Sequence, residues 1–190
     1  PDVPTLADWI ARLVSICGFE QAVLVGHSMG SLIALHCAAT QPTLVSALVL
    51  VGSVAPMTVA PALLEAARTA RERAHAMINQ WSFAPASQLG ASPSPGMRLV
   101  DSNRRLMQRQ AEGVLANDLG ACNAYQDGLR LAADVRVPTL LICGERDQMT
   151  PPRATKPLAA ALVNVPGGAR TITLAGAGHA MMAETPEALS

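Results

Sequence analysis

Aromatic side chains are scarce in this chain, making up 3% of its 190 residues. The full set is Trp9, Phe19, Trp81, Phe83 and Tyr125. A surplus of charge is absent too, because 14 Lys and Arg residues stand against 14 Asp and Glu residues. A nucleic-acid-binding protein needs basic side chains to neutralise phosphates and, for single strands, rings on which bases stack. The composition therefore argues against nucleic acid as a partner, and equally against docking on an anionic membrane.

Long apolar runs and paired cysteines are also missing. No run approaches the roughly 18 to 20 residues of a membrane-spanning helix, and no signal-peptide pattern is visible. Cys17, Cys37, Cys122 and Cys143 form no CxxC pair, which disfavours a zinc site. Each adjoins Ala or Ile, as is typical of a free cysteine that packs as a small hydrophobe. We therefore expect a cytoplasmic protein without a metal.

Apolar residues make up 50% of the chain, enough for a substantial core. Short apolar runs predict buried strands at residues 21–25, 47–51, 138–143 and 170–174. Helical patterns occur at residues 5–17, 30–40 and 153–163. In the last of these, Pro157 would be tolerated only in the first turn. Strands that alternate with helices predict an α/β fold, a parallel sheet with flanking helices.

The segment 56–130 interrupts this alternation, because it contains no convincing strand. Its composition predicts helices at residues 61–80, 99–116 and 121–133. Proline and glycine predict a loop over residues 84–96. We interpret the segment as a helical insertion between two strands of the sheet.

Gly26-His27-Ser28-Met29-Gly30 is a G-x-S-x-G pentapeptide that follows a strand and opens a helix. In this context the pattern is typical of a nucleophile elbow, a turn sharp enough to strain the serine backbone. Side chains two residues before or after the serine would collide, so we expect sterics to require both Gly26 and Gly30. The turn would lift the Ser28 hydroxyl above the carboxyl end of the sheet. There the backbone N–H of Met29 would donate to a developing oxyanion.

A serine hydroxyl needs an imidazole as base to act as a nucleophile near neutral pH. His179 is best placed, because it follows a strand and a glycine-rich loop that reach the same rim of the sheet. His27 lies inside the turn and cannot fold back on its neighbour. We expect His36 to be packed in the core and His75 to lie on a solvated helix face.

The imidazole in turn needs a carboxylate to orient it. Glu145 and Asp147 both follow the strand at residues 138–143, at the same rim. Asp134 precedes that strand and would lie at the wrong end of the sheet. The spacing alone does not choose between Glu145 and Asp147.

A resemblance to a known family is carried by residues 23–30, residues 140–152 and the stretch Ala175-Gly-Ala-Gly-His179. They resemble the α/β-hydrolase superfamily, in its branches of lid-bearing serine esterases, lactonases, haloperoxidase-like enzymes and C–C hydrolases. The family's order along the chain is serine, acid, histidine. The resemblance implies that Ser28 is the nucleophile, Asp147 the acid and His179 the base of a catalytic triad. It implies hydrolysis of a small ester-like molecule, a carboxylic ester or lactone, without a metal or organic cofactor.

The resemblance also divides the chain into domains. Residues 1–55 and 131–190 correspond to part of the hydrolase core, and residues 56–130 to a helical cap over the active site. Five side chains of that cap could line an apolar pocket, although a place in the cap's own core is the favoured alternative. These are Met77, Trp81, Phe83, Met97 and Met107.

The same residues leave other functions open. C–C bond hydrolysis and perhydrolysis or haloperoxidase-like chemistry use the same triad, because pocket shape selects the substrate. A non-catalytic ligand receptor on the same fold is an alternative from another class. A halide-releasing enzyme is disfavoured, because family members of that kind carry Asp where Ser28 stands. No pattern indicates the acyl group or the oligomeric state.

The chain departs from the family at its beginning, where members have further strands and a His-Gly loop that supplies a second oxyanion donor. No His here is followed by Gly, so we expect a fragment of a larger protein. The strand at residues 21–25 would then be a sheet edge with unpaired backbone groups.

We expect the 190 residues alone to be poorly soluble and nearly inactive, because one lost oxyanion donor costs about 100- to 1,000-fold in rate. The upstream segment, once restored, should give a protein that hydrolyses esters. Turnover of p-nitrophenyl esters by both chains measures the difference. Robust turnover by the shorter chain would contradict the expectation.

Overall fold

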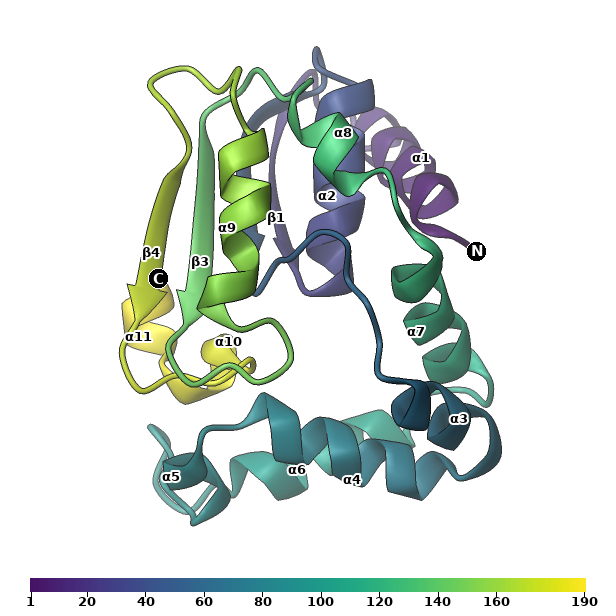
Figure 1. The fold of residues 1–190 in the computed structure, drawn as a ribbon, viewed down its shortest axis with the longest axis vertical. Helices are drawn as coiled ribbons and strands as arrows, with labels where there is room; N and C mark the ends of the chain where they lie inside the picture. Colours follow the sequence, from purple (N-terminus) through teal and green to yellow (C-terminus); the bar gives the residue numbers. More distant parts are fainter.

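The computed structural model describes residues 1–190 and contains a four-stranded parallel sheet in the order β1-β2-β3-β4. The strands are β1 (Ala22–His27), β2 (Val45–Val51), β3 (Thr139–Gly144) and β4 (Arg170–Leu174). All four predicted strands are present, and the α/β fold class is confirmed (Figure 1). Since the strands are parallel, their carboxyl ends form a single rim, where the loops after β1, β3 and β4 meet.

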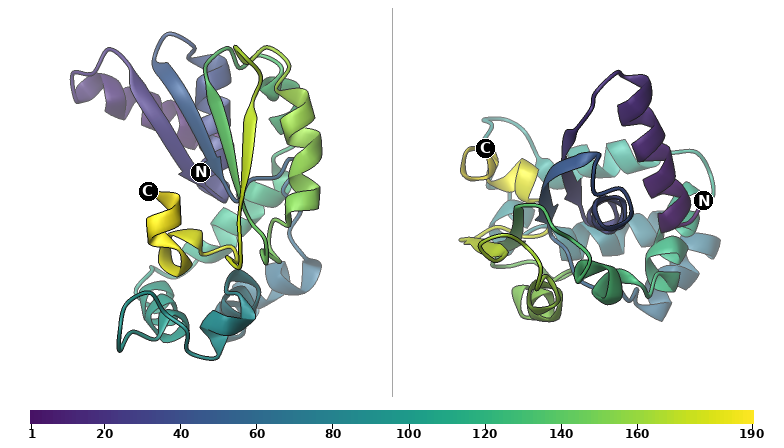
Figure 2. Two further views of the ribbon diagram at one scale, coloured as in Figure 1. Left: turned by 90° about the vertical axis from the view of Figure 1, so that its left-hand side faces the viewer. Right: turned by 90° about the horizontal axis from the view of Figure 1, so that it is seen from above.

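One face of the sheet carries the main core. It is covered by helices α1 (Val3–Ile16), α2 (Met29–Thr40), α8 (Gly128–Ala132) and α9 (Pro152–Ala161) (Figures 1 and 2). Leu48 and Leu141 point from the strands toward Leu35 and Leu158 of the helices, and all four side chains are buried. This layer gives the rim a rigid support.

The opposite face is only partly covered. Because strand side chains alternate between faces, Val25, Val51 and Ile142 share this side of the sheet. The short helices α10 (Met181–Glu184) and α11 (Pro186–Leu189) cover the part near the carboxyl ends, where Val51 and Ile142 pack on Met181. Val25 is 68% exposed, and β1 is the edge of the sheet, as the sequence predicts.

The insertion between β2 and β3 is helical, as predicted, and α4 and α6 lie beyond the carboxyl ends of the strands (Figure 1). Its helices are α3 (Pro61–Thr69), α4 (Arg71–Ser82), α5 (Pro85–Gln88), α6 (Leu99–Gln108) and α7 (Val114–Ala124). Leu63 and Cys122 from these helices share a buried cluster with Leu32 of α2, so the insertion packs directly on the sheet layer. No helix of the structure combines the length and hydrophobicity needed to cross a membrane.

Several predicted helix bounds are wrong. The helix expected at residues 61–80 is broken at Ala70, whose backbone is not helical. The helix expected at residues 99–116 ends at Gln108, and Gly113, with φ of 82°, precedes α7. The helix expected at residues 121–133 is divided between α7 and α8, and the predicted loop 84–96 contains α5.

Two smaller expectations also fail. Pro157 lies in the interior of α9 rather than in its first turn. Its ring is on the exposed side, where water can bind the carbonyl that loses its hydrogen bond. Cys37, Cys122 and Cys143 are free and buried as expected, but Cys17 is exposed at the end of α1.

Candidate active site

Ser28 occupies a strained turn between β1 and α2. Its φ of 53° is the only positive value at a residue other than glycine. The backbone N–H of Ser28 donates to the Val51 carbonyl at 2.9 Å, and the Ser28 carbonyl accepts from the Ser31 N–H at 2.9 Å. These bonds hold the strained residue in place. The Met29 N–H, as the first of α2, has no acceptor within the helix.

The two glycines of the turn are not equivalent. A Cβ on Gly26 would lie 2.2 Å from the Gly30 carbonyl oxygen and 2.7 Å from the Ser31 Cα. A Cβ on Gly30 would meet nothing within 4 Å, and the φ of Gly30 is ordinary. The expectation that sterics require both glycines is therefore correct at Gly26 and wrong at Gly30, because the crowding comes from the backbone of α2 pressing on the strand.

Asp147 and His179 form a buried hydrogen-bonded pair at the rim. The distance from Nδ1 of His179 to Oδ2 of Asp147 is 2.8 Å, and both residues are buried. The other carboxylate oxygen accepts from the N–H groups of Met149 and Thr150 at 2.8 and 2.7 Å, and the Thr150 hydroxyl donates to Oδ2 at 2.7 Å. Burial alone would raise the pKa of Asp147, but the contacts with His179 and Thr150 outweigh it and hold the pKa below its usual value.

Glu145, the alternative acid, lies elsewhere. One of its carboxylate oxygens accepts from the Gly176 N–H at 2.8 Å, and its side chain is 48% exposed. The carboxylate therefore supports the loop that precedes His179 and does not touch the imidazole. Of the two acids that the spacing left open, the fold brings only Asp147 to His179.

His27 has a contact that the sequence did not reveal. Its Nε2–H donates to the carbonyl oxygen of His179 at 2.9 Å, and the two ring centroids are 4.5 Å apart. A carbonyl oxygen only accepts, so this bond fixes the proton of His27 on Nε2. Burial, assisted by the nearby imidazole of His179, lowers the pKa of His27 to about 4. His27 is thus neutral near pH 7 and anchors the backbone of His179.

The other two histidines also differ from expectation. His75 is fully buried between helices, with no hydrogen-bond partner for either ring nitrogen, rather than on a solvated face. His36 is only half-buried, and its Nδ1 lies 3.1 Å from the Tyr125 hydroxyl. Neither lines the cavity at Ser28.

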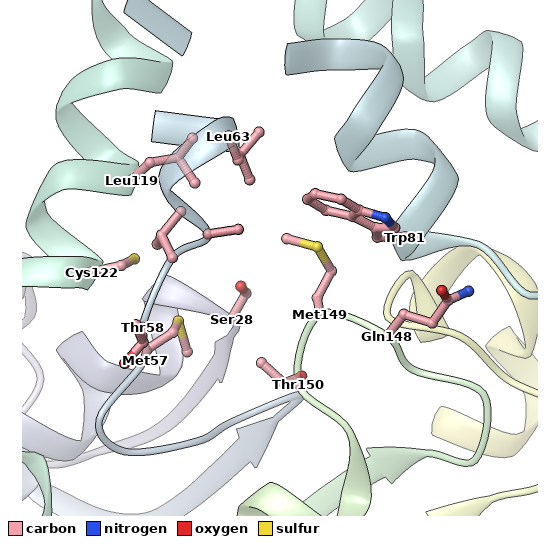
Figure 3. A pocket seen from close by; sticks show the side chains of 12 residues that line it. Ser28, Met57, Thr58, Leu63, Trp81, Leu119, Cys122, Gln148, Met149 and Thr150 are labelled. Atoms are coloured by element: carbon pink, nitrogen blue, oxygen red, sulfur yellow. The ribbon is translucent and has the colours of Figure 1, made fainter. Parts of the chain in front are cut away.

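The Ser28 hydroxyl points into a cavity of about 320 Å³ beneath the insertion (Figure 3). The walls are mostly apolar and come from the loop after β2, from α3, α4 and α7, and from the loop after β3. The lining residues are Ser28, Met57, Thr58, Val59, Ala60, Leu63, Trp81, Leu119, Cys122, Gln148, Met149 and Thr150. Asp147 and His179 are not among the lining residues, but Thr150, which binds both, is, so the pair adjoins the cavity that Ser28 faces. The His179 ring is hydrogen-bonded to Thr150 and Asp147, and the Ser28 hydroxyl makes no hydrogen bond to it.

Only one of the five side chains named as possible pocket residues lines this cavity, namely Trp81. Phe83 is 1% exposed in the interior, and Met97 is 47% exposed. The sulfur of Met107 lies 3.5 Å from the side-chain nitrogen of Asn79, between α4 and α6. No group of three or more His, Cys, Asp or Glu side chains is arranged to hold a metal ion.

Thr150 is a site residue that sequence reasoning missed. A signal was present, because an Asp in a turn commonly accepts from backbone N–H groups two or three residues later. That pattern predicts contacts from Asp147 to residues 149 and 150. The contact between the Thr150 hydroxyl and His179, at 3.1 Å, joins two distant loops and has no local signal.

Comparison with known proteins identifies relatives over nearly the whole chain. A family model described as the alpha/beta hydrolase fold matches residues 2–186. RutD of Klebsiella pneumoniae (strain 342), whose name proposes a carbamate hydrolase, is 30% identical over 93% of this chain. The chain spans 65% of the length of that relative.

Solved structures show the same fold. A thermophilic esterase is 27% identical, with a TM-score of 0.80, over 100% of this chain and 70% of its own. The enol-lactonase from Burkholderia xenovorans LB400 has a TM-score of 0.84 at 22% identity, with 100% and 70% of the two chains covered. At that identity, the likeness to the lactonase concerns the fold alone.

The unequal glycines give a matched pair of variants. Gly26→Ala should lower the free energy of unfolding by at least about 3 kcal/mol, because its Cβ would overlap the backbone of α2. Gly30→Ala should be neutral or stabilising by up to about 1 kcal/mol, because alanine favours a helix and meets no atom. Urea denaturation of both variants measures the difference. Equal effects would contradict the steric account.

Unfolding should be easier in mild acid. The unfolded chain protonates His27 near pH 6.5, whereas in the folded protein its pKa is about 4. Below pH 6.5 the unfolded chain gains a proton at His27 that the folded protein does not bind. The free energy of unfolding therefore has its full value above pH 6.5 and decreases as the pH falls toward 4, by about 3 kcal/mol at most. His36 and His75, whose pKa values burial also lowers, act in the same direction.

Urea denaturation at a series of pH values tests this. His27→Gln keeps a donor for the His179 carbonyl but cannot take up a proton in this range. The slope of stability between pH 6.5 and 4 should therefore be shallower in the variant. An unchanged slope would show that His27 is not a source of the acid sensitivity.

Proposed function

Because the chain belongs to the alpha/beta hydrolase fold family, we propose that it is a serine hydrolase that cleaves a carboxylic ester or lactone through an acyl-enzyme. The observation that carries the proposal is the buried Asp147–His179 pair, at 2.8 Å, which adjoins the apolar cavity that Ser28 faces from its strained turn. This arrangement supports the proposal, because the reaction requires a nucleophile, a base, a group that orients the base, and room for an acyl group, and residues of the right types are present for each.

The reaction starts at Ser28. His179 takes the proton of the hydroxyl on Nε2 as the serine oxygen attacks the carbonyl carbon of the substrate. Asp147 holds Nδ1 of the imidazole and stabilises the imidazolium that forms, and its own four hydrogen bonds keep it ionised. The Met29 N–H donates to the oxyanion. His179 then returns the proton to the leaving alcohol. In the second half of the reaction, His179 takes a proton from water as the water attacks the acyl-enzyme, and returning that proton to Ser28 releases the acid.

The helical segment 56–130 acts as a cap in this proposal, and it contributes the apolar walls around Ser28. Leu63, Trp81 and Leu119 face the cavity from three different helices (Figure 3). A cavity of about 320 Å³ with such walls suits a small or medium apolar acyl group. Thr58 and Gln148 are polar residues of the lining and are candidates to bind a hydroxyl or carbonyl of the substrate.

A carbamate is the second candidate substrate, and the relative RutD favours it. A carbamate presents the same carbonyl to a serine nucleophile, so the triad chemistry is unchanged and only the leaving group differs. Since the chain spans less than two thirds of RutD, the choice between substrates rests on assay. C–C bond hydrolysis, perhydrolysis and a role as a ligand receptor are the other functions between which assays have to distinguish.

A fluorophosphonate probe tests the proposal, because it forms a stable bond only with an activated serine. The full-length protein should be labelled at Ser28, and Ser28→Ala should abolish the labelling. Asp147→Asn should slow the labelling by on the order of 100-fold or more, because the imidazole loses its orientation. A panel of p-nitrophenyl ester, lactone, carbamate and dienoic diketone then assigns the substrate.

Ser46→Ala is the matched control, because Ser46 is exposed on β2 away from the cavity. It should be labelled at the rate of the unchanged protein. A full-length protein with Ser28 intact that takes up no probe would contradict the proposal and favour the ligand receptor.

A further inference from the structure

Five consecutive residues around His179 are held by hydrogen bonds to other parts of the molecule. The Gly176 N–H donates to Glu145, and the Ala177 carbonyl accepts from the Arg146 N–H at 2.8 Å. The His179 carbonyl accepts from His27 at 2.9 Å. The Ala180 N–H donates to the Ser82 carbonyl of the insertion at 3.0 Å, and the Gly178 N–H donates to Glu184 of α10 at 2.7 Å.

Glu184, at the end of α10, connects this loop to the insertion. Its Oε2 accepts from the Gly178 N–H, the residue before His179. Its Oε1 accepts from the Ala84 N–H at 2.8 Å and from the Ser87 hydroxyl at 2.7 Å. One carboxylate therefore bridges the residue next to His179 and the junction between α4 and α5.

Beside the Glu184 carboxylate, the backbones of the two segments also lie in direct contact. A Cβ on Gly178 would lie 2.6 Å from the Ser82 carbonyl oxygen and 2.7 Å from the Ala84 nitrogen. Ser82 and Ala84 are 5% and 3% exposed, so this contact between backbones is closed to water. A shift of the α4–α5 junction therefore cannot be absorbed by a flexible side chain and passes to the loop of His179.

The junction is also next to the cavity. Trp81, whose ring faces the cavity, immediately precedes Ser82 (Figure 3). An acyl group that fills the cavity would press on the same turn of α4 whose backbone binds Ala180.

We propose that Glu184 is a positioning residue that couples the seating of the insertion to the position of His179. The inference rests on the proposed function, since it gives His179 the role of base. Glu184 does not touch the substrate. It holds the loop of His179 against the α4–α5 junction. The insertion therefore has to be packed against this loop for the imidazole to face Ser28. Contacts between the acyl group and the insertion would thereby change the rate at which Ser28 attacks the substrate.

Glu184→Gln tests the proposal with little change of shape. Glutamine offers one acceptor oxygen and an NH₂ group, so a donor must face either the Gly178 N–H or the Ala84 N–H, and one arm of the bridge breaks. In the full-length protein, the rate of fluorophosphonate labelling per reactive serine, and kcat for a p-nitrophenyl ester, should fall on the order of 10- to 100-fold. KM should stay within about twofold, because the cavity lining is unchanged.

A purely structural role predicts another result. Loss of folded protein would lower the final amount of labelled serine and leave the rate per reactive serine unchanged. Glu187→Gln is the matched control, because Glu187 is exposed on α11 and its carboxylate makes no hydrogen bond. It should label at the rate of the unchanged protein.

Ser87→Ala provides a second test should Glu184→Gln fail to fold. It removes a bond from the insertion alone, and we expect a fall of roughly threefold in the labelling rate. Ser92→Ala, in an exposed loop of the insertion, should have no effect. Equal labelling rates for the unchanged protein and for the Glu184 and Ser87 variants would overturn the coupling alone. A lack of labelling in the unchanged protein would overturn the proposed function as well.

Discussion

Close contact between backbones at the carboxyl rim of the sheet is the constraint on which the site depends. A Cβ on Gly144, the last residue of β3, would lie 2.1 Å from the Gly178 carbonyl oxygen. Glycine at this point lets the loop after β4 lie directly on the end of β3. Asp147 and His179, which are 32 positions apart in the chain, can then approach to 2.8 Å. Bulkier residues here would separate the two loops and with them the buried pair.

Gly26 and Gly178, where strand, turn and insertion meet, are two further positions at which the lack of a side chain lets backbone segments pack in direct contact. Polar atoms at these crossings are paired with backbone groups. His27 binds the carbonyl of His179, Glu184 binds the N–H of Gly178, and Asp147 binds two consecutive N–H groups. A site built in this way has little freedom to relax, which suits a base that must face one hydroxyl. It also means that the insertion and the sheet cannot be understood as independent parts around Ser28.

Much of this could be predicted from the sequence, where the determining interactions are local. Short apolar runs that end at glycine mark the strands, and the strain at Ser28 follows from its flanking pattern. The helix bounds in the insertion could not be predicted, because Ala70 favours a helix and nothing local marks it as a break. The burial of His75 arises from packing between helices. The contacts of His27 and Glu184 join residues 152 and 100 positions away, so no spacing rule reveals them.

Mass spectrometry of the trapped acyl-enzyme tests the central claim most directly. The full-length protein is mixed with a p-nitrophenyl ester, quenched in acid within one turnover and digested. The account predicts one added acyl group on the peptide that contains Ser28, and none in Ser28→Ala. Turnover of the ester without an acylated Ser28, or with the acyl group on another residue, would contradict it.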